Sequence, residues 1–186
     1  MIFVDSLDVE LTVSGSPDWT YRKAKMHLPS VVGTLGMITH RDRETVEADE
    51  HQSIITDHWE VDVLEPLPKF ITRYLDFRLV EVRSVLHCDD RDREAEWYVS
   101  VQNFEGLLDV CEGTITFAEI PQGTRIDVRG NFDLDLSAVP GIPSLLAFPL
   151  RGRLGKLANR IINNYTGELE DELERIDLEH TSEDRA

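Results

Sequence analysis

The feature that most constrains this chain is a series of short segments, between residues 37 and 136, in which apolar and polar side chains alternate. A period of two is typical of a β-strand with one face against a core and one face in water. In the segment 55–63, for example, Trp59 and Val61 share one side, and Glu60 lies on the other. Five or more such segments follow one another through short polar connections such as CDDRDRE, which predicts an antiparallel meander.

The apolar side of this meander needs a second layer to cover it. The C-terminal part of the chain supplies one, because eight hydrophobic or aromatic residues from Leu150 to Ile176 recur every three or four positions. This spacing predicts one long amphipathic helix. At ~1.5 Å per residue the helix would be ~40 Å long, which is enough to cross a whole sheet.

Further elements are predicted before the meander. Residues 7–13 alternate and predict a first strand with one wet side. Ser16 is a good N-cap and Pro17 a good first helical residue, so together they predict a short helix. A second short helix is predicted from Ser30, although Gly33 weakens its helical propensity.

The composition limits the class of protein. A chain of 186 residues with 41% hydrophobic residues can form one buried domain, expected over residues 1–178, followed by a flexible acidic tail at 179–186. The net charge of −17 argues against nucleic acid as a partner, since phosphate neutralisation needs a basic surface. We expect a cytoplasmic protein, because no apolar run approaches ~20 residues, the first residues do not resemble a secretory signal, and two cysteines are too few for a disulfide scaffold.

Three stretches, together with the order of the elements, resemble the START / Bet v 1-like superfamily, also called SRPBCC or polyketide cyclase and lipid-transport-like domains. The stretches are GSPDWTYRKAKMHLPSVVG after the first strand, QGTRIDVRGNF in the last strand, and PGIP before the C-terminal helix. The resemblance covers residues 3–176 and implies an α+β helix-grip fold: a curved antiparallel sheet, two short helices, and the long C-terminal helix packed across the sheet above an apolar cavity. One departure is PLPKFITRYLDF, which is more apolar than an ordinary loop and either covers the cavity or begins a strand.

The resemblance also implies a function, the binding or transport of an apolar small molecule or lipid between the sheet and the C-terminal helix. The residues expected to bind the ligand are Asp57, Trp59, Val61, Arg78, Trp97, Val99, Ile115, Phe117, Phe132, Leu157, Ile161 and Tyr165. Asp57 is the exception in this set, because an unpaired charge on an apolar face is costly. It is expected to contact a polar group of the ligand, to act as a base, to lie at the frayed end of its strand, or to pair with Arg78 on a neighbouring strand.

Two other classes of function stay open. A polyketide cyclase or aromatase-like enzyme, which the same resemblance implies, would use Asp57, Arg78 or Tyr165 for proton transfer. The lack of a recognisable acid–base set in the sequence favours a binding protein that is not an enzyme. A protein-interaction module built on the same scaffold is the third alternative, since a fold does not fix a function.

No cofactor or metal site is expected. The chain has six histidines, at positions 27, 40, 51, 58, 87 and 180. They form neither an HExxH motif nor a tight cluster with acids, so they are expected on the surface and in loops. The HCDD segment contains potential metal ligands, but Cys88 and Cys111 lack the CxxC partners that zinc sites use. Cys111 shares the apolar side of its strand and is expected to be a small core residue.

One basic segment stands out in this acidic chain. From Leu136 to Gly167 there is no Asp or Glu, and the segment carries four basic residues, Arg151, Arg153, Lys156 and Arg160. A basic residue near an anionic bilayer contributes ~1 kcal/mol of binding free energy, so the segment predicts an anion-attracting patch that makes weak contact with an anionic membrane. The alternative is that the four basic side chains pair with acids of the sheet.

Overall fold

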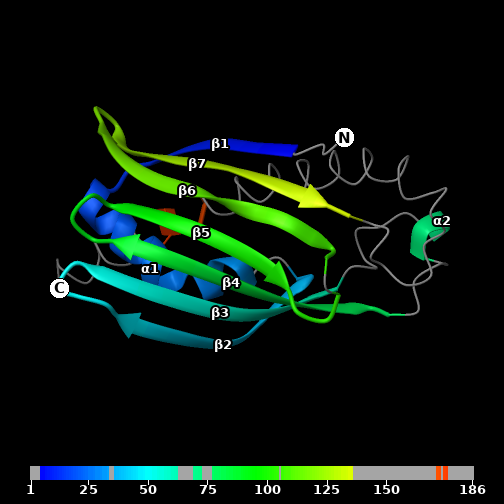
Figure 1. Cartoon of the computed structure of the whole chain (residues 1–186). Coiled ribbons are helices and arrows are strands. Elements are labelled where there is room, and N and C mark those ends of the chain that lie inside the picture. Colours follow the sequence, from blue (N-terminus) through cyan, green and yellow to red (C-terminus); the bar gives the residue numbers. More distant parts are fainter. Residues whose placement is uncertain are drawn as a thin grey trace.

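The structure is a computed structural model of the chain, and it describes residues 5–33, 36–62, 69–72, 77–104, 106–135, 171–172 and 174–175. Its main element is a curved, seven-stranded antiparallel sheet with the order β1-β7-β6-β5-β4-β3-β2 (Figure 1). The elements are β1 (Asp5–Val13), α1 (Pro17–Gly33), β2 (Ile38–Glu47), β3 (Gln52–Asp62), α2 (Lys69–Thr72), β4 (Leu79–Asp89), β5 (Glu94–Val101), β6 (Leu108–Ile120) and β7 (Gly123–Leu134). Each strand from β2 to β6 pairs with the next one along the chain, so the predicted meander is confirmed, and β1 completes the sheet beside β7.

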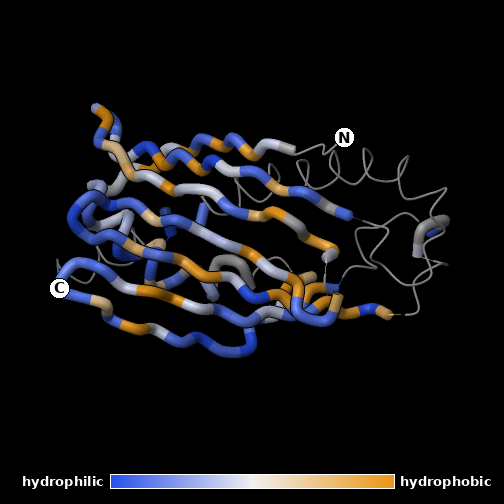
Figure 2. The backbone as a smooth tube through the Cα atoms, in the orientation of Figure 1, coloured by the Kyte–Doolittle hydropathy of each residue, from blue (hydrophilic) through white to orange (hydrophobic). Residues whose placement is uncertain are grey.

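The sheet has one apolar face, here named the inner face, and one polar face, named the outer face. Helix α1 packs on the inner face, behind the sheet in Figure 1. Figure 2 shows the alternation of hydrophobic and hydrophilic residues along the strands that produces the two faces. The buried core beneath α1 consists of Val9, Leu11, Val13, Tyr21, Ile55, Leu86, Cys88, Ala95, Phe117 and Ile126.

The hairpin between β4 and β5 fastens α1 to the sheet. This turn is the polar connection expected from the sequence, and its Asp90 accepts hydrogen bonds from Tyr21 Oη and Lys25 Nζ, each at 2.8 Å. Although partial burial opposes the effect, these two donors hold the pKa of the Asp90 carboxyl below its usual value. Burial, together with the hydrogen bond to Asp90, raises the pKa of Tyr21. Tyr21 therefore stays a neutral donor at neutral pH.

Helix α1 is longer than the sequence predicts. In place of two short helices the structure has one, which begins at the expected Pro17, ends at Gly33 and contains Pro29. A proline has no N–H, so the carbonyl of the residue four positions earlier loses its helical partner. That carbonyl belongs to Lys25, and it accepts a hydrogen bond from Arg43 Nη1 of β2 at 2.8 Å instead. Arg43 of the sheet thus donates the hydrogen bond that the nitrogen of Pro29 cannot donate.

The long C-terminal helix predicted over residues 150–176, and its position over the sheet, lie largely outside the described residues. Residues 171–172 and 174–175 of this segment are described, and they are helical. Most of PLPKFITRYLDF also lies outside the described residues, and its described part, α2, is a single helical turn.

Candidate functional site

The most unusual group on the inner face is the carboxylate of Asp57, which is fully buried in the middle of β3. Two residues of β2 contact it. Arg43 Nε and Nη2 donate to its two oxygens at 2.8 Å each, and His40 Nε2 lies 2.9 Å from Oδ1. These three residues form the Asp57 cluster.

A β-bulge explains how both partners reach the same carboxylate. Residues three apart on a regular strand point to opposite faces of the sheet. The register between β2 and β3 shifts at Arg41, so that His40 lies opposite Trp59 and Arg43 lies opposite Asp57. Because a bulge adds one residue to one strand, both side chains face inward.

The guanidinium of Arg43 joins the sheet to α1. Its Nη1 donates to the carbonyl oxygens of Lys25 at 2.8 Å and Met26 at 3.3 Å, while its other side holds Asp57. Two parallel bonds between a guanidinium and a carboxylate are among the strongest charge-assisted hydrogen bonds. The cluster therefore satisfies its buried charges with partners from two elements.

The predicted pair between Asp57 and Arg78 is not formed. Arg78 Nε donates to Asp62 at 2.7 Å instead, and the Arg78 side chain is largely exposed. The physical reason is the register between β3 and β4, which places Ser84 opposite Asp57 and leaves Arg78, just before β4, beside Asp62. The bulge in β2 brings Arg43 to the carboxylate instead. The expectation that all histidines are surface or loop residues is likewise wrong for His40, which contacts a buried carboxylate.

Apolar side chains surround His40 on the inner face. Its ring packs edge-on against the indole of Trp59, with the ring centroids 4.8 Å apart. Trp59 Nε1 donates to Ser84 Oγ at 2.9 Å, which satisfies the indole. Along β2, Ile38 lies opposite Val61, and both are half-buried. The imidazole is thus a polar group in an apolar setting.

Part of the inner face is only half-buried. Its half-buried apolar residues include Val61, Val82, Trp97, Val99, Val101, Cys111, Ile115 and Val128. Four of the predicted ligand-binding residues belong to this set, and two others, Trp59 and Phe132, are buried on the same face. Phe117 lies in the core beneath α1, where its ring packs edge-on against Tyr21 with centroids 5.3 Å apart.

The remaining site predictions fall outside the described residues. They are Leu157, Ile161 and Tyr165, predicted to lie on the C-terminal helix, and Arg151, Arg153, Lys156 and Arg160, predicted to form a basic patch.

Trp97 lies across two glycines of neighbouring strands. Gly113 of β6 is opposite both Trp97 of β5 and Gly130 of β7. A Cβ atom on Gly113 would lie 2.7 Å from Trp97 Cζ2, and one on Gly130 would lie 2.3 Å from it. The glycines therefore make room for the indole. Its Nε1 is buried and has no hydrogen-bond partner among the described residues.

Sequence reasoning missed His40, Arg43 and the two glycines. Regular alternation places His40 and Arg43 on opposite faces, and nothing in the sequence of β2 announces the bulge at Arg41. The two glycines could have been noticed in the sequence, because an isolated glycine inside a strand often marks a position that another group approaches closely. Gly113 and Gly130 both interrupt alternating segments in this way.

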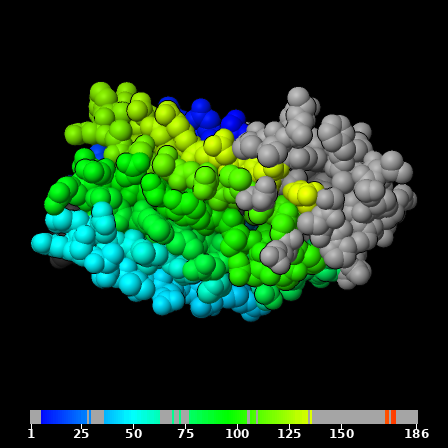
Figure 3. Space-filling model, in the orientation of Figure 1, coloured from blue at the N-terminus to red at the C-terminus, as the bar shows by residue number. Residues whose placement is uncertain are grey.

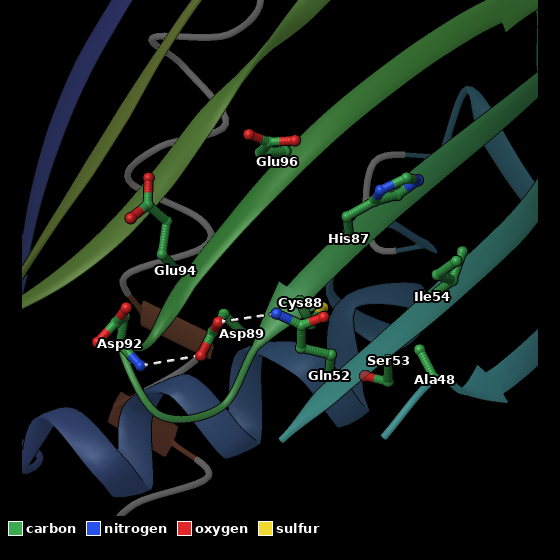
Figure 4. Close-up of a pocket in the computed structure, with 10 residues that line it drawn as sticks. All are labelled: Ala48, Gln52, Ser53, Ile54, His87, Cys88, Asp89, Asp92, Glu94 and Glu96. Carbon is green, nitrogen blue, oxygen red and sulfur yellow. Dashed lines mark hydrogen bonds between the residues drawn. The ribbon is translucent and has the colours of Figure 1, made fainter. Parts of the chain in front are cut away.

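A hollow of about 390 Å³ lies at the end of the sheet near the β4–β5 turn (Figure 4). It is lined by Ala48, Gln52, Ser53, Ile54, His87, Cys88, Asp89, Asp92, Glu94 and Glu96. Backbone N–H groups of the turn and the side chain of Gln52 donate hydrogen bonds to Asp89 and lower the pKa of its carboxyl. This carboxylate therefore stabilises the turn. Figure 3 shows this face of the molecule, on which side chains of neighbouring strands lie side by side.

Within the described ranges, no group of three or more His, Cys, Asp or Glu side chains is placed to hold a metal ion. No helix in the part of the chain that the structure describes is long and apolar enough to cross a membrane.

Cys111 offers a test of burial on the inner face. Burial raises the pKa of its thiol from 9.0 to about 11. The unfolded chain therefore releases this proton first as the pH rises, and stability present below pH 9 is lost between pH 9 and 11. Since one pKa unit corresponds to ~1.36 kcal/mol, wild type should lose ~2–3 kcal/mol more than Cys111→Ala across this window. Urea denaturation in reducing buffer measures both slopes, and equal slopes would show a solvated thiol.

The chain has the Bet v 1-like (SRPBCC) fold, because solved structures with this fold match at least 90% of it. The similar structures include TTHA0849 from Thermus thermophilus, with 18% identity, a TM-score of 0.62, and coverage of 90% of this chain and 96% of that one. The Zhui aromatase/cyclase from Streptomyces sp. R1128 has 13% identity, a TM-score of 0.64, and coverage of 93% and 95%. Ara h 8.0201 has 12% identity, a TM-score of 0.52, and coverage of 92% and 98%.

At these identities the likeness establishes the fold alone. No protein-family model and no curated protein sequence matches the chain. The predicted resemblance to the START / Bet v 1-like superfamily is therefore confirmed for the fold.

Proposed function

We propose that the protein binds an apolar small molecule or lipid against the inner face, between the sheet and the C-terminal helix. The observation that carries this proposal is the set of half-buried apolar side chains around Trp97 and Val99, on a face whose other part is fully buried beneath α1. Apolar surface beside a few fixed polar groups is typical of small-molecule sites. The unpartnered Nε1 of Trp97 supplies one such polar group, a hydrogen-bond donor.

A polyketide cyclase or aromatase-like enzyme is the second candidate. The observation that favours it is the contact between a part-exposed imidazole, His40, and a buried carboxylate, Asp57, since such pairs serve in proton transfer. The Zhui aromatase/cyclase has a similar fold, which is compatible with an enzyme function. A shared fold does not by itself favour that function over ligand binding.

The binding proposal is tested by filling the inner face. Val99→Trp places an indole among the half-buried side chains, whereas Ser100→Trp places the same indole on the outer face of the same strand. Binding of the uncharged fluorescent probe N-phenyl-1-naphthylamine is expected to weaken at least about tenfold in Val99→Trp, because the volume for the probe is lost. Native mass spectrometry of the purified wild type is expected to show a co-purified adduct of lipid or small-molecule mass.

The matched variant Ser100→Trp is expected to bind the probe like wild type, and circular dichroism checks that both variants fold. If both variants bind equally well, the half-buried face is not the site. Conversion of a cyclisable polyketide-like substrate by the wild type, lost in His40→Phe, would favour the enzyme instead.

A further inference from the structure

We propose that His40 is a hydrogen-bond acceptor for a ligand hydroxyl, so that the ligand is an apolar molecule carrying a phenol or alcohol group. This inference rests on the proposed function, because it names the chemical class that the same inner face would take. Its basis is the Asp57 cluster, which fixes the proton on one nitrogen of the imidazole and leaves the other nitrogen open.

The first step is the position of the proton on His40. Arg43 is always charged and gives Asp57 two parallel hydrogen bonds, an arrangement that suits an ionised carboxylate. An ionised carboxylate can only accept, so the 2.9 Å contact with His40 requires a proton on Nε2. In the neutral imidazole the lone pair is then on Nδ1, which makes this atom an acceptor.

The second step is access. Asp57 is 0% exposed and Trp59 is buried, whereas the His40 side chain is 24% exposed. Arg43 is also part-exposed, but its Nε, Nη1 and Nη2 already donate to Asp57 and to carbonyl oxygens of α1. Nδ1 of His40 has no hydrogen-bond partner among the described residues. A bound molecule would therefore meet an acceptor in this cluster, and not a charge.

The third step is the setting of that acceptor. On the inner face His40 is next to the indole of Trp59 and to the half-buried side chains Ile38 and Val61. An acceptor in apolar surroundings favours a ligand that brings its own donor, because an unpaired polar group is costly there. A mainly apolar ligand with one hydroxyl fits this combination of groups.

A second histidine provides a matched control. His58 of β3 contacts a carboxylate of β2, that of Asp42, at 3.1 Å, but this pair lies on the outer face and both side chains are well exposed. His40 and His58 thus have the same kind of partner and differ in the face of the sheet. A role that depends on the inner face should be lost only with His40.

The test compares 2-naphthol with 2-methoxynaphthalene, which has the same rings but no O–H. Isothermal titration gives the ratio of their dissociation constants for wild type, His40→Phe and His58→Phe. The preference for 2-naphthol is expected to fall about fivefold in His40→Phe, as the loss of one hydrogen bond predicts. His58→Phe is expected to keep the wild-type ratio. An unchanged ratio in a folded His40→Phe overturns the inference.

Two further outcomes separate this inference from the proposed function. If both compounds bind wild type and nitrogen-15 NMR shows no ligand-induced shift of Nδ1 with 2-naphthol, the inference fails while the proposed function stands. This measurement uses wild type, so it decides the matter even if His40→Phe does not fold. If neither compound binds wild type, both the inference and the binding function are overturned.

Discussion

Replacing Asp57 by alanine is expected to lower the free energy of unfolding by about 3–5 kcal/mol, because it leaves the guanidinium of Arg43 without its counter-charge. Asp57 is 0% exposed and the Arg43 side chain is 20% exposed, so water can replace little of the lost interaction. Arg43 also holds the Lys25 carbonyl, so its displacement is expected to loosen α1. Urea denaturation measures the loss of stability, and proteolysis within α1 measures the loosening.

Two controls show whether the loss comes from the buried charge. The double variant Arg43→Met/Asp57→Leu removes both charges and keeps the volume apolar, and it is expected to recover most of the stability. Asp42→Ala removes an exposed carboxylate of β2 and is expected to change stability by no more than about 0.5 kcal/mol. If Asp57→Ala costs no more than Asp42→Ala, the Asp57 cluster does not hold α1 to the sheet.

The second large effect is expected from Gly113→Ala, at about 3 kcal/mol of destabilisation. A Cβ atom at this position would lie 2.0 Å from the carbonyl oxygen of Arg129 and 2.6 Å from Cα of Gly130. Both contacts are with the backbone of β7, which cannot rotate away as a flexible side chain can. The two strands must therefore separate, and the indole of Trp97 must shift with them. Urea denaturation and the near-ultraviolet dichroism of the tryptophans report the two changes.

A matched control lies next to this glycine. Glu112→Ala leaves the same alanine methyl side chain one residue earlier, on the exposed side of β6, and is expected to change stability by no more than about 0.5 kcal/mol. The expectation for Gly113 is refuted if its alanine variant unfolds at the same urea concentration as the Glu112 variant.

Much of the sheet could be predicted from the sequence, because the alternation of apolar and polar residues within a strand shows which of its side chains are buried. Alternation identifies β3, β5, β6 and β7 without knowledge of their neighbours, the β4 segment is predicted as a strand of uncertain phase, and short polar connections indicate the antiparallel order. The same alternation marks Asp57 as a charge on an apolar face, because its neighbours two and four positions along the strand are Trp59 and Val61. The position of a residue along its own strand is local information, and the sequence contains it.

The partners of Asp57 could not be predicted, because they depend on a shift in register. Without the bulge at Arg41, Arg43 belongs to the polar side of β2. The register between β3 and β4, which places Ser84 and not Arg78 beside Asp57, is likewise absent from the sequence pattern. The continuity of α1 was missed for a related reason. Pro29 is unfavourable inside a helix considered alone, and the hydrogen bond by which Arg43 of β2 satisfies the Lys25 carbonyl comes from outside the helix.

The bulge in β2 also bears on how molecules of this protein meet one another. β2 is an outermost strand of the sheet, and no other strand of the described residues pairs with its outer edge, where backbone groups could template a strand from a second molecule. The extra residue interrupts that row, and the exposed side chains of Arg41, Asp42, Glu44 and Glu47 bring charge to it. An incoming strand would have to match an irregular, charged border on a chain of net charge −17. We therefore expect the distortion that turns Arg43 inward to hinder strand addition at this edge as well.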